Sequence, residues 1–187
     1  MSQKKNCNYF YAMKDVTRIL TATENDLDPI VELVNSAYRG EGSKKGWTTE
    51  AGLIEGSLRT DETALRQMLL TPGSVMLLCK EGNKLLGCVY LKKEDNGLYL
   101  GMLSVSPAAQ GSGTGKRLML AAEGHAKKIL AKYIMMTVID VRYELIAWYE
   151  RHGYKRTGET KPFPDDDKFG KAKQPLQFII LKKEISA

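Results

Sequence analysis

The chain holds few of the residues that form disulfides, metal centres or histidine-based catalytic sites. Its 187 residues include three cysteines, Cys7, Cys79 and Cys88, whose number and spacing match neither a disulfide framework nor a zinc site. Cys79 and Cys88 fall in apolar strand patterns and are expected to be buried. His125 and His152 each fall in a helical pattern beside charged neighbours. We therefore expect no metal and no His-based triad, and the cysteine pattern favours the reducing cytoplasm.

Long apolar runs and clusters of one charge are also missing. No segment reaches the ~20 apolar residues of a membrane span, and residues 1–16 lack the apolar core of a signal peptide, so a soluble protein without a membrane partner is expected. The net charge of +6 is interspersed with 22 acidic residues rather than gathered in a Lys/Arg stripe. A nucleic-acid partner is therefore not expected. The positive excess suits a polyanionic cofactor as well as an ordinary solvated surface.

The length and a hydrophobic content of 43% suit one domain. Residues 1–16 are polar and are expected to be a dispensable extension, with residues 17–187 forming the single domain. The pair Gly82-Asn83 is typical of a tight hairpin, which predicts an antiparallel meander between residues 75 and 105. Apolar periodicity predicts strands at residues 18–22, 75–80, 84–92, 98–105, 133–139, 154–158 and 176–182, and helices at residues 27–38, 61–70, 116–130 and 143–151.

A glycine-rich segment, residues 110–116 (QGSGTGK), connects the strand at 98–105 to the helix that follows. Glycines allow positive φ and close approach to a ligand, and the first N–H groups of a helix attract anions, so this loop is predicted to bind a phosphate. Walker A spacing is absent because Gly111 and Gly115 enclose three residues rather than four and Arg117 replaces Ser or Thr. Lys116 breaks the dinucleotide pattern G-x-G-x-x-G at its last position.

Two motifs together point to one family. Gln110, Gly113 and Gly115 fit Q-x-x-G-x-G, although a tight strand-to-helix turn would explain the glycines alone. Residues 148–154 (WYERHGY) are similar to Y-x-x-x-G-F with Tyr149 as its tyrosine, although a core aromatic before a helix-ending glycine would suit this segment alone. With both motifs in order, the chain resembles the GNAT superfamily of acyl-CoA N-acyltransferases over roughly residues 17–185.

The resemblance implies a fold, a cofactor and a general acid. The GNAT fold is an α/β (α+β) architecture with a mixed central sheet of about seven strands and about four flanking helices. Strand 98–105 is implied to splay from strand 133–139, which leaves a wedge where the pantetheine of acetyl-CoA pairs like a strand. Tyr149 is implied to protonate the departing thiolate. The residues implied in cofactor binding are Leu103, Ser104, Val105, Gln110, Gly111, Ser112, Gly113, Thr114, Gly115, Lys116 and Arg142.

Two positions depart from the family pattern. Many relatives place a glutamate as general base where this chain has Thr137, so Asp140 is the first candidate base, with Glu144, Glu50 and a water chain as alternatives. Relatives also favour asparagine where this chain has Arg142. That arginine is expected to contact a cofactor phosphate, or to pair with Glu144 or Asp140.

The acceptor side is predicted from position in the chain. The loop at residues 38–56 follows the first helix, and Tyr38, Trp47 and Glu50 are expected to form one acceptor wall, with Glu50 facing an ammonium. An ordinary surface loop with a packed tryptophan is the alternative, in which case the loop at 159–174 would form the wall.

The resemblance thus implies an enzyme that transfers acetyl from acetyl-CoA directly, in a ternary complex, to a primary or secondary amine of a small molecule or peptide. A non-catalytic acyl-CoA sensor or interaction module of the same fold is the alternative. A monomer or homodimer is expected.

Overall fold

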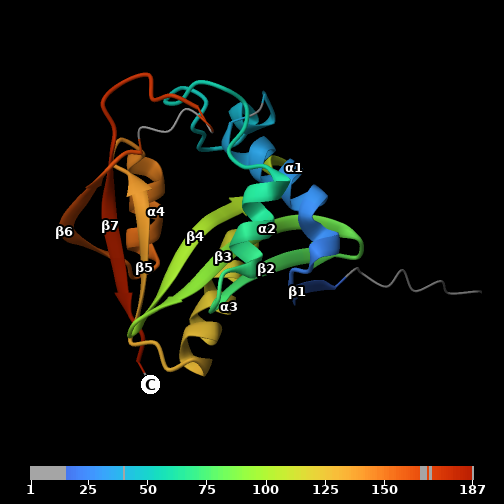
Figure 1. Ribbon diagram of the computed structural model, residues 1–187, viewed down its shortest axis with the longest axis vertical. Coiled ribbons are helices and arrows are strands. Elements are labelled where there is room, and N and C mark those ends of the chain that lie inside the picture. Colours follow the sequence, from blue (N-terminus) through green and yellow to red (C-terminus); the bar gives the residue numbers. More distant parts are fainter. Residues whose placement is uncertain (1–15, 40, 165–167, 169, 187) are drawn as a thin grey trace, which may run out of the picture.

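The computed structural model describes residues 16–39, 41–164, 168 and 170–186. Its centre is a seven-stranded sheet with the strand order β1-β2-β3-β4-β5-β7-β6 (Figure 1). The pair β4 and β5 is parallel, and the other neighbouring strands are antiparallel. The strands are β1 (Thr17–Thr21), β2 (Ser74–Glu81), β3 (Lys84–Glu94), β4 (Gly97–Val105), β5 (Tyr133–Ile139), β6 (Lys155–Pro162) and β7 (Gln177–Glu184).

Helices cover both faces of the sheet. Helices α1 and α2 form one hydrophobic cluster with β2 and β3, and residues of α3 and α4 join a larger cluster on the opposite face (Figure 1). None of the helices in the described ranges is long and apolar enough to cross a membrane. The helices are α1 (Leu27–Tyr38), α2 (Glu62–Leu70), α3 (Thr114–Lys128) and α4 (Tyr143–Arg151), with short 3-10 turns at Glu24–Asp26, Glu41–Lys45 and Pro107–Ala109.

Local sequence explains most of these elements. Leu27, Ile30 and Val34 recur on one face of α1 and are buried, as the spacing of three and four residues predicts. Residues 86–91 of β3 are buried without alternation, because helices pack on both faces of this central strand. Asp61 begins α2 as its N-cap, since its carboxylate accepts a hydrogen bond from Ala64 N–H at 2.7 Å.

The predicted wedge between β4 and β5 is confirmed. The two strands pair only between Gly97–Tyr99 and Tyr133–Met135, after which they diverge (Figure 1). A β-bulge interrupts the β3–β4 pairing where Met102 adopts a φ of 51°. A bulge increases local twist and bends the strand. The edge of β4 from residue 100 onward therefore faces away from β5 and is open to a ligand.

The order of elements matches the prediction, whereas the bounds of several elements differ, most of all at β6. Strand β6 continues to Pro162, where the sequence predicted a loop from residue 159, because a bulge at Gly158 (φ 87°) lets pairing with β7 resume at Thr160. Helix α3 begins at Thr114, two residues early, because Gly113 serves as its N-cap at a φ of 84°. Apart from Val16, the predicted extension at residues 1–16 lies outside the described residues, so its dispensability stays a prediction.

Candidate active site

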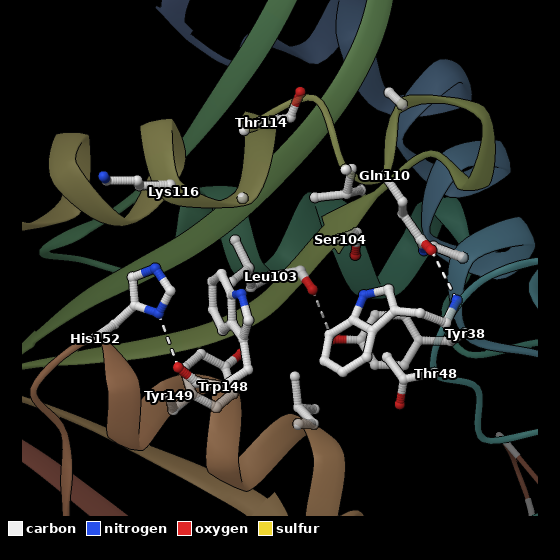
Figure 2. Close-up of a pocket in the computed structure, with 18 of the residues that line it drawn as sticks. Tyr38, Thr48, Leu103, Ser104, Gln110, Thr114, Lys116, Trp148, Tyr149 and His152 are labelled. Atoms are coloured by element: carbon white, nitrogen blue, oxygen red, sulfur yellow. Dashed lines mark hydrogen bonds between the residues drawn. The ribbon is translucent and has the colours of Figure 1, made fainter.

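A cleft of about 340 Å³ lies at the open side of the wedge, between the end of β4, the start of α3 and the inner face of α4 (Figure 2). It brings together most of the residues that the two motifs and the acceptor loop predicted. Ser112, Glu50 and Asp140 are not part of its lining. The predicted residues that line it are Tyr38, Trp47, Leu103, Ser104, Val105, Gln110, Gly111, Gly113, Thr114, Gly115, Lys116, Arg142 and Tyr149.

The glycine loop has the geometry of an anion cradle. The N–H of Arg117 makes the first bond of α3, to the Gly113 carbonyl at 3.0 Å, so the N–H groups of residues 114–116 have no acceptor within the helix. These groups and the positive end of the helix dipole meet at the cleft, where the Lys116 side chain is exposed. The hydroxyls of Ser112 and Thr114 bond each other at 2.8 Å, so they brace the loop from within.

Gln110 lines the cleft and also contacts the loop at residues 38–56. Its Oε1 accepts a hydrogen bond from Trp47 N–H at 3.0 Å (Figure 2), and an ideal Cβ added at Gly46 would lie only 2.9 Å from its amide atoms. The glycine loop is therefore tied to the loop at residues 38–56. On the other wall, Tyr38 donates its phenol hydrogen to the Leu103 carbonyl at 3.2 Å.

Helix α4 contributes residues that the sequence analysis did not single out. Trp148 packs edge-on against Tyr149, with ring centroids 5.1 Å apart, and stacks at a tilt with His152 at 4.2 Å. The Nδ1 of His152 donates to the Trp148 carbonyl at 2.8 Å (Figure 2). Leu145 completes this face of the cleft. Helical spacing from Tyr149 was the signal that could have found Leu145 and His152, because residues three or four apart share a helix face.

A second chamber of about 190 Å³ lies between β4, β5 and Phe178 of β7. It adjoins the cleft of about 340 Å³, because both cavities are lined by Tyr38, Leu103, Arg142, Leu145 and Tyr149. Burial raises the pKa of the Tyr149 hydroxyl far above its usual value and raises that of Tyr38 to about 12, so both phenols are protonated at neutral pH. Tyr149 thus presents a proton donor in the wall that the two chambers share.

Glu50 lines the second chamber as part of a buried ion-pair cluster. Its Oε2 accepts a hydrogen bond from Arg39 Nε, and its Oε1 accepts one from Arg142 Nη1, each at 3.2 Å. Arg59 Nε lies 3.8 Å from the same carboxylate. The sequence had offered Glu50 as an acceptor-wall residue facing an ammonium, and as an alternative base. The structure instead has both carboxylate oxygens of Glu50 bonded to guanidinium groups.

The other candidate bases lie elsewhere. Asp140 lines neither chamber, and its carboxylate accepts a hydrogen bond from Gln177 N–H at 3.5 Å at the start of β7. Glu144 is exposed on the first turn of α4. Arg142 pairs with neither of them, contrary to one sequence-based alternative. Its Nη2 donates to Thr48 at 3.0 Å while Nη1 bonds Glu50, because the start of α4 faces the loop at residues 38–56.

Comparison with known proteins agrees with this architecture. A model of the acetyltransferase (GNAT) family matches residues 32–154. The chain belongs to this family. This GNAT acetyltransferase has no match among curated protein sequences.

Solved structures with the same fold cover nearly the whole chain. The ribosomal-protein-S18-alanine N-acetyltransferase from Escherichia coli superposes with a TM-score of 0.69 at 14% identity, over 92% of this chain and 96% of that one. The PaiA N-acetyltransferase from Thermoplasma acidophilum in complex with coenzyme A gives 0.67 at 20% identity, over 90% and 99%. YncA, a putative acetyltransferase from Salmonella typhimurium with its cofactor acetyl-CoA, gives 0.65 at 18% identity, over 92% and 95%. At these identities the likeness concerns the fold.

Proposed function

We propose that this GNAT acetyltransferase transfers the acetyl group of acetyl-CoA to a primary or secondary amine of a small molecule or peptide, directly and within a ternary complex. The observation that carries the proposal is the position of Tyr149. Its ring belongs to the wall shared by the cofactor cleft and the second chamber, and its hydroxyl has no hydrogen-bond partner among the described residues. A phenol in this position can donate its proton in a reaction between a cofactor in the cleft and an acceptor in the second chamber.

The cofactor cleft fits coenzyme A. The N–H groups of residues 114–116 and the Lys116 ammonium suit its pyrophosphate, and an ideal Cβ added at Gly111 or Gly113 would enter open space at the cradle. The unpaired edge of β4 suits the amides of pantetheine. Two structural neighbours are complexes with coenzyme A and acetyl-CoA, which supports the same ligand here. Acetyl-CoA supplies the activated thioester.

The chain's own groups would then assist acyl transfer. As the amine nitrogen forms its bond to the thioester carbonyl carbon, a backbone N–H of residues 103–105 can stabilise the negative charge on oxygen. As the carbon–sulfur bond breaks, Tyr149 gives its proton to the thiolate and later regains one from solvent. Neither of the two described cysteines, Cys79 and Cys88, lines either chamber, and burial raises the pKa of Cys88 to about 12, which disfavours an acyl-cysteine route through them.

The carboxylates near the second chamber decide which group could take the proton from the acceptor amine. Glu50 is the one carboxylate among the described residues that line it, and two guanidinium groups already donate to it. Asp140, the first candidate base, is bonded to β7 outside both cavities. We therefore infer that the ammonium loses its proton to water before attack, rather than to a dedicated side chain.

The test combines calorimetry with a transfer assay. Acetyl-CoA should bind at one site per chain, and thiol release should depend on an added amine and yield an N-acetyl product by mass spectrometry. Binding without transfer to any amine of a broad panel would instead identify an acyl-CoA sensor. Absence of acetyl-CoA binding would refute both readings.

A further inference from the structure

The charged side chains at the second chamber carry more positive than negative charge. We call Arg39, Arg59, Arg142 and Glu50 the arginine cluster, in which all three guanidinium groups lie within 4 Å of the single carboxylate. Among the described residues, two of these positive charges therefore have no carboxylate to compensate them. An unpaired charge in a protein interior costs several kcal/mol. A buried excess of positive charge therefore indicates a site where a bound ligand supplies the negative charge.

The three arginines are not equivalent. Arg39 is buried, donates from Nε to Glu50 and donates from Nη1 to the Leu58 carbonyl at 2.7 Å, so its role is to hold the segment between residues 39 and 58 together. Arg59 and Arg142, in contrast, each have a buried Nε–H without a hydrogen-bond partner among the described residues. A buried donor of this kind costs free energy until it meets an acceptor.

Both unpaired donors belong to side chains that line the second chamber. The guanidinium groups of Arg59 and Arg142 lie over the same ring, that of Tyr38, at 5.5 and 5.7 Å from its centroid. Arg59 also lines an adjoining cavity of about 140 Å³ with Glu50 and Phe178, and its side chain is 34% exposed. Arg59 is therefore accessible to a ligand, whereas Arg39 is held by its protein partners.

We propose that the acceptor amine also carries a carboxylate, which binds Arg59 and Arg142 in the second chamber while the amine is directed toward Tyr149. The proposal deepens the proposed function and rests on it. A carboxylate is an acceptor-only group that matches the planar fork of guanidinium donors, and it supplies negative charge where the cluster lacks it. The acceptor class is thus amino-acid-like rather than that of simple alkylamines.

The experiment compares matched amines that differ in the carboxylate alone. The probes are alanine with ethylamine, phenylalanine with phenethylamine, and lysine with cadaverine, each at saturating acetyl-CoA and corrected for the fraction of neutral amine. We expect the carboxylated member to have the higher kcat/KM in at least one pair. Arg59→Gln should reduce that kcat/KM by about 10- to 150-fold, the value of a charge-assisted hydrogen bond, and should reduce the kcat/KM of the partner amine much less.

Two further variants serve as controls. Arg66→Gln removes the same charge from α2, where Arg66 is exposed and pairs with Glu24 and Glu62, and it should leave both rates unchanged. Arg59→Lys keeps the positive charge but loses the planar set of guanidinium donors, so its kcat/KM for the carboxylated amine should lie between those of the wild type and Arg59→Gln. This variant still tests the inference if circular dichroism shows that Arg59→Gln folds poorly.

Failure of the carboxylate inference and failure of the proposed acetyl transfer would give different results. Equal kcat/KM within every pair, or a preference that survives in Arg59→Gln, would overturn the carboxylate inference while acetyl transfer itself remained. Absence of product from all six amines together with absence of acetyl-CoA binding would overturn the proposed function, and the inference with it.

Discussion

Replacing Gly113 with alanine separates the fold of the glycine loop from its proposed use. Gly113 is the N-cap of α3 at a φ of 84°, and an ideal Cβ there finds no heavy atom within 4 Å. The cost to folding is therefore the left-handed backbone alone, about 1–2 kcal/mol. For a domain of this size, that cost lowers Tm by roughly 2–8 °C in a thermal melt.

The effect on acetyl-CoA binding should be larger than the effect on folding. The added methyl group would enter the open space at the start of α3, where we propose that the pyrophosphate binds. Losing one charge-assisted hydrogen bond costs about 1.5–3 kcal/mol, which raises Kd by roughly 10- to 150-fold in isothermal titration calorimetry.

Gly158 provides a matched control for backbone strain. It has a φ of 87° and an equally open Cβ position, but it lies in β6 and does not line the cleft. Gly158→Ala should therefore lower Tm to a similar degree without a change in Kd. An unchanged Kd in Gly113→Ala, or an equal rise of Kd in both variants, would refute the phosphate cradle.

Three other predictions concern the shared wall and the arginine cluster. Tyr149→Phe should lower kcat by about 10²- to 10⁴-fold with Kd for acetyl-CoA unchanged, since the ring is kept and the proton donor is lost; full activity would assign Tyr149 to packing. Because burial raises the pKa of this acid above the usual value of about 10, kcat should rise with pH as the amine deprotonates and show no descending limb below pH ~10; a limb near pH 8 that disappears in Tyr149→Phe would contradict this. Glu50→Gln should lower the free energy of unfolding by about 3–5 kcal/mol in urea, because three guanidinium groups lose their carboxylate, whereas Glu144→Gln on the exposed face of α4 should change it by less than ~0.5 kcal/mol.

The parts of the fold that the sequence predicted are those specified by neighbours in the chain. The bounds of α1, β5 and α4 follow from apolar spacing and flanking turn residues, and the structure has them at the predicted positions. The conformation of the glycine loop was likewise predictable, because it depends on the glycines themselves and on the helix that follows them. The continuation of β6 past Gly158 was not, since it depends on pairing with β7.

The acceptor side shows why side-chain roles were harder to predict than elements. Glu50 and Arg142 are 92 positions apart in the chain, and their pairing exists only because α4 begins opposite the loop at residues 38–56. Arg59 lies in no helix or strand, so no periodic pattern marks it. Read singly, Glu50 looks like a site for an ammonium and Arg142 like a site for a phosphate. Brought together with two further arginines, the same residues leave an excess of positive charge among the described side chains, and on this excess we base the proposal of an acceptor that brings a negative charge of its own.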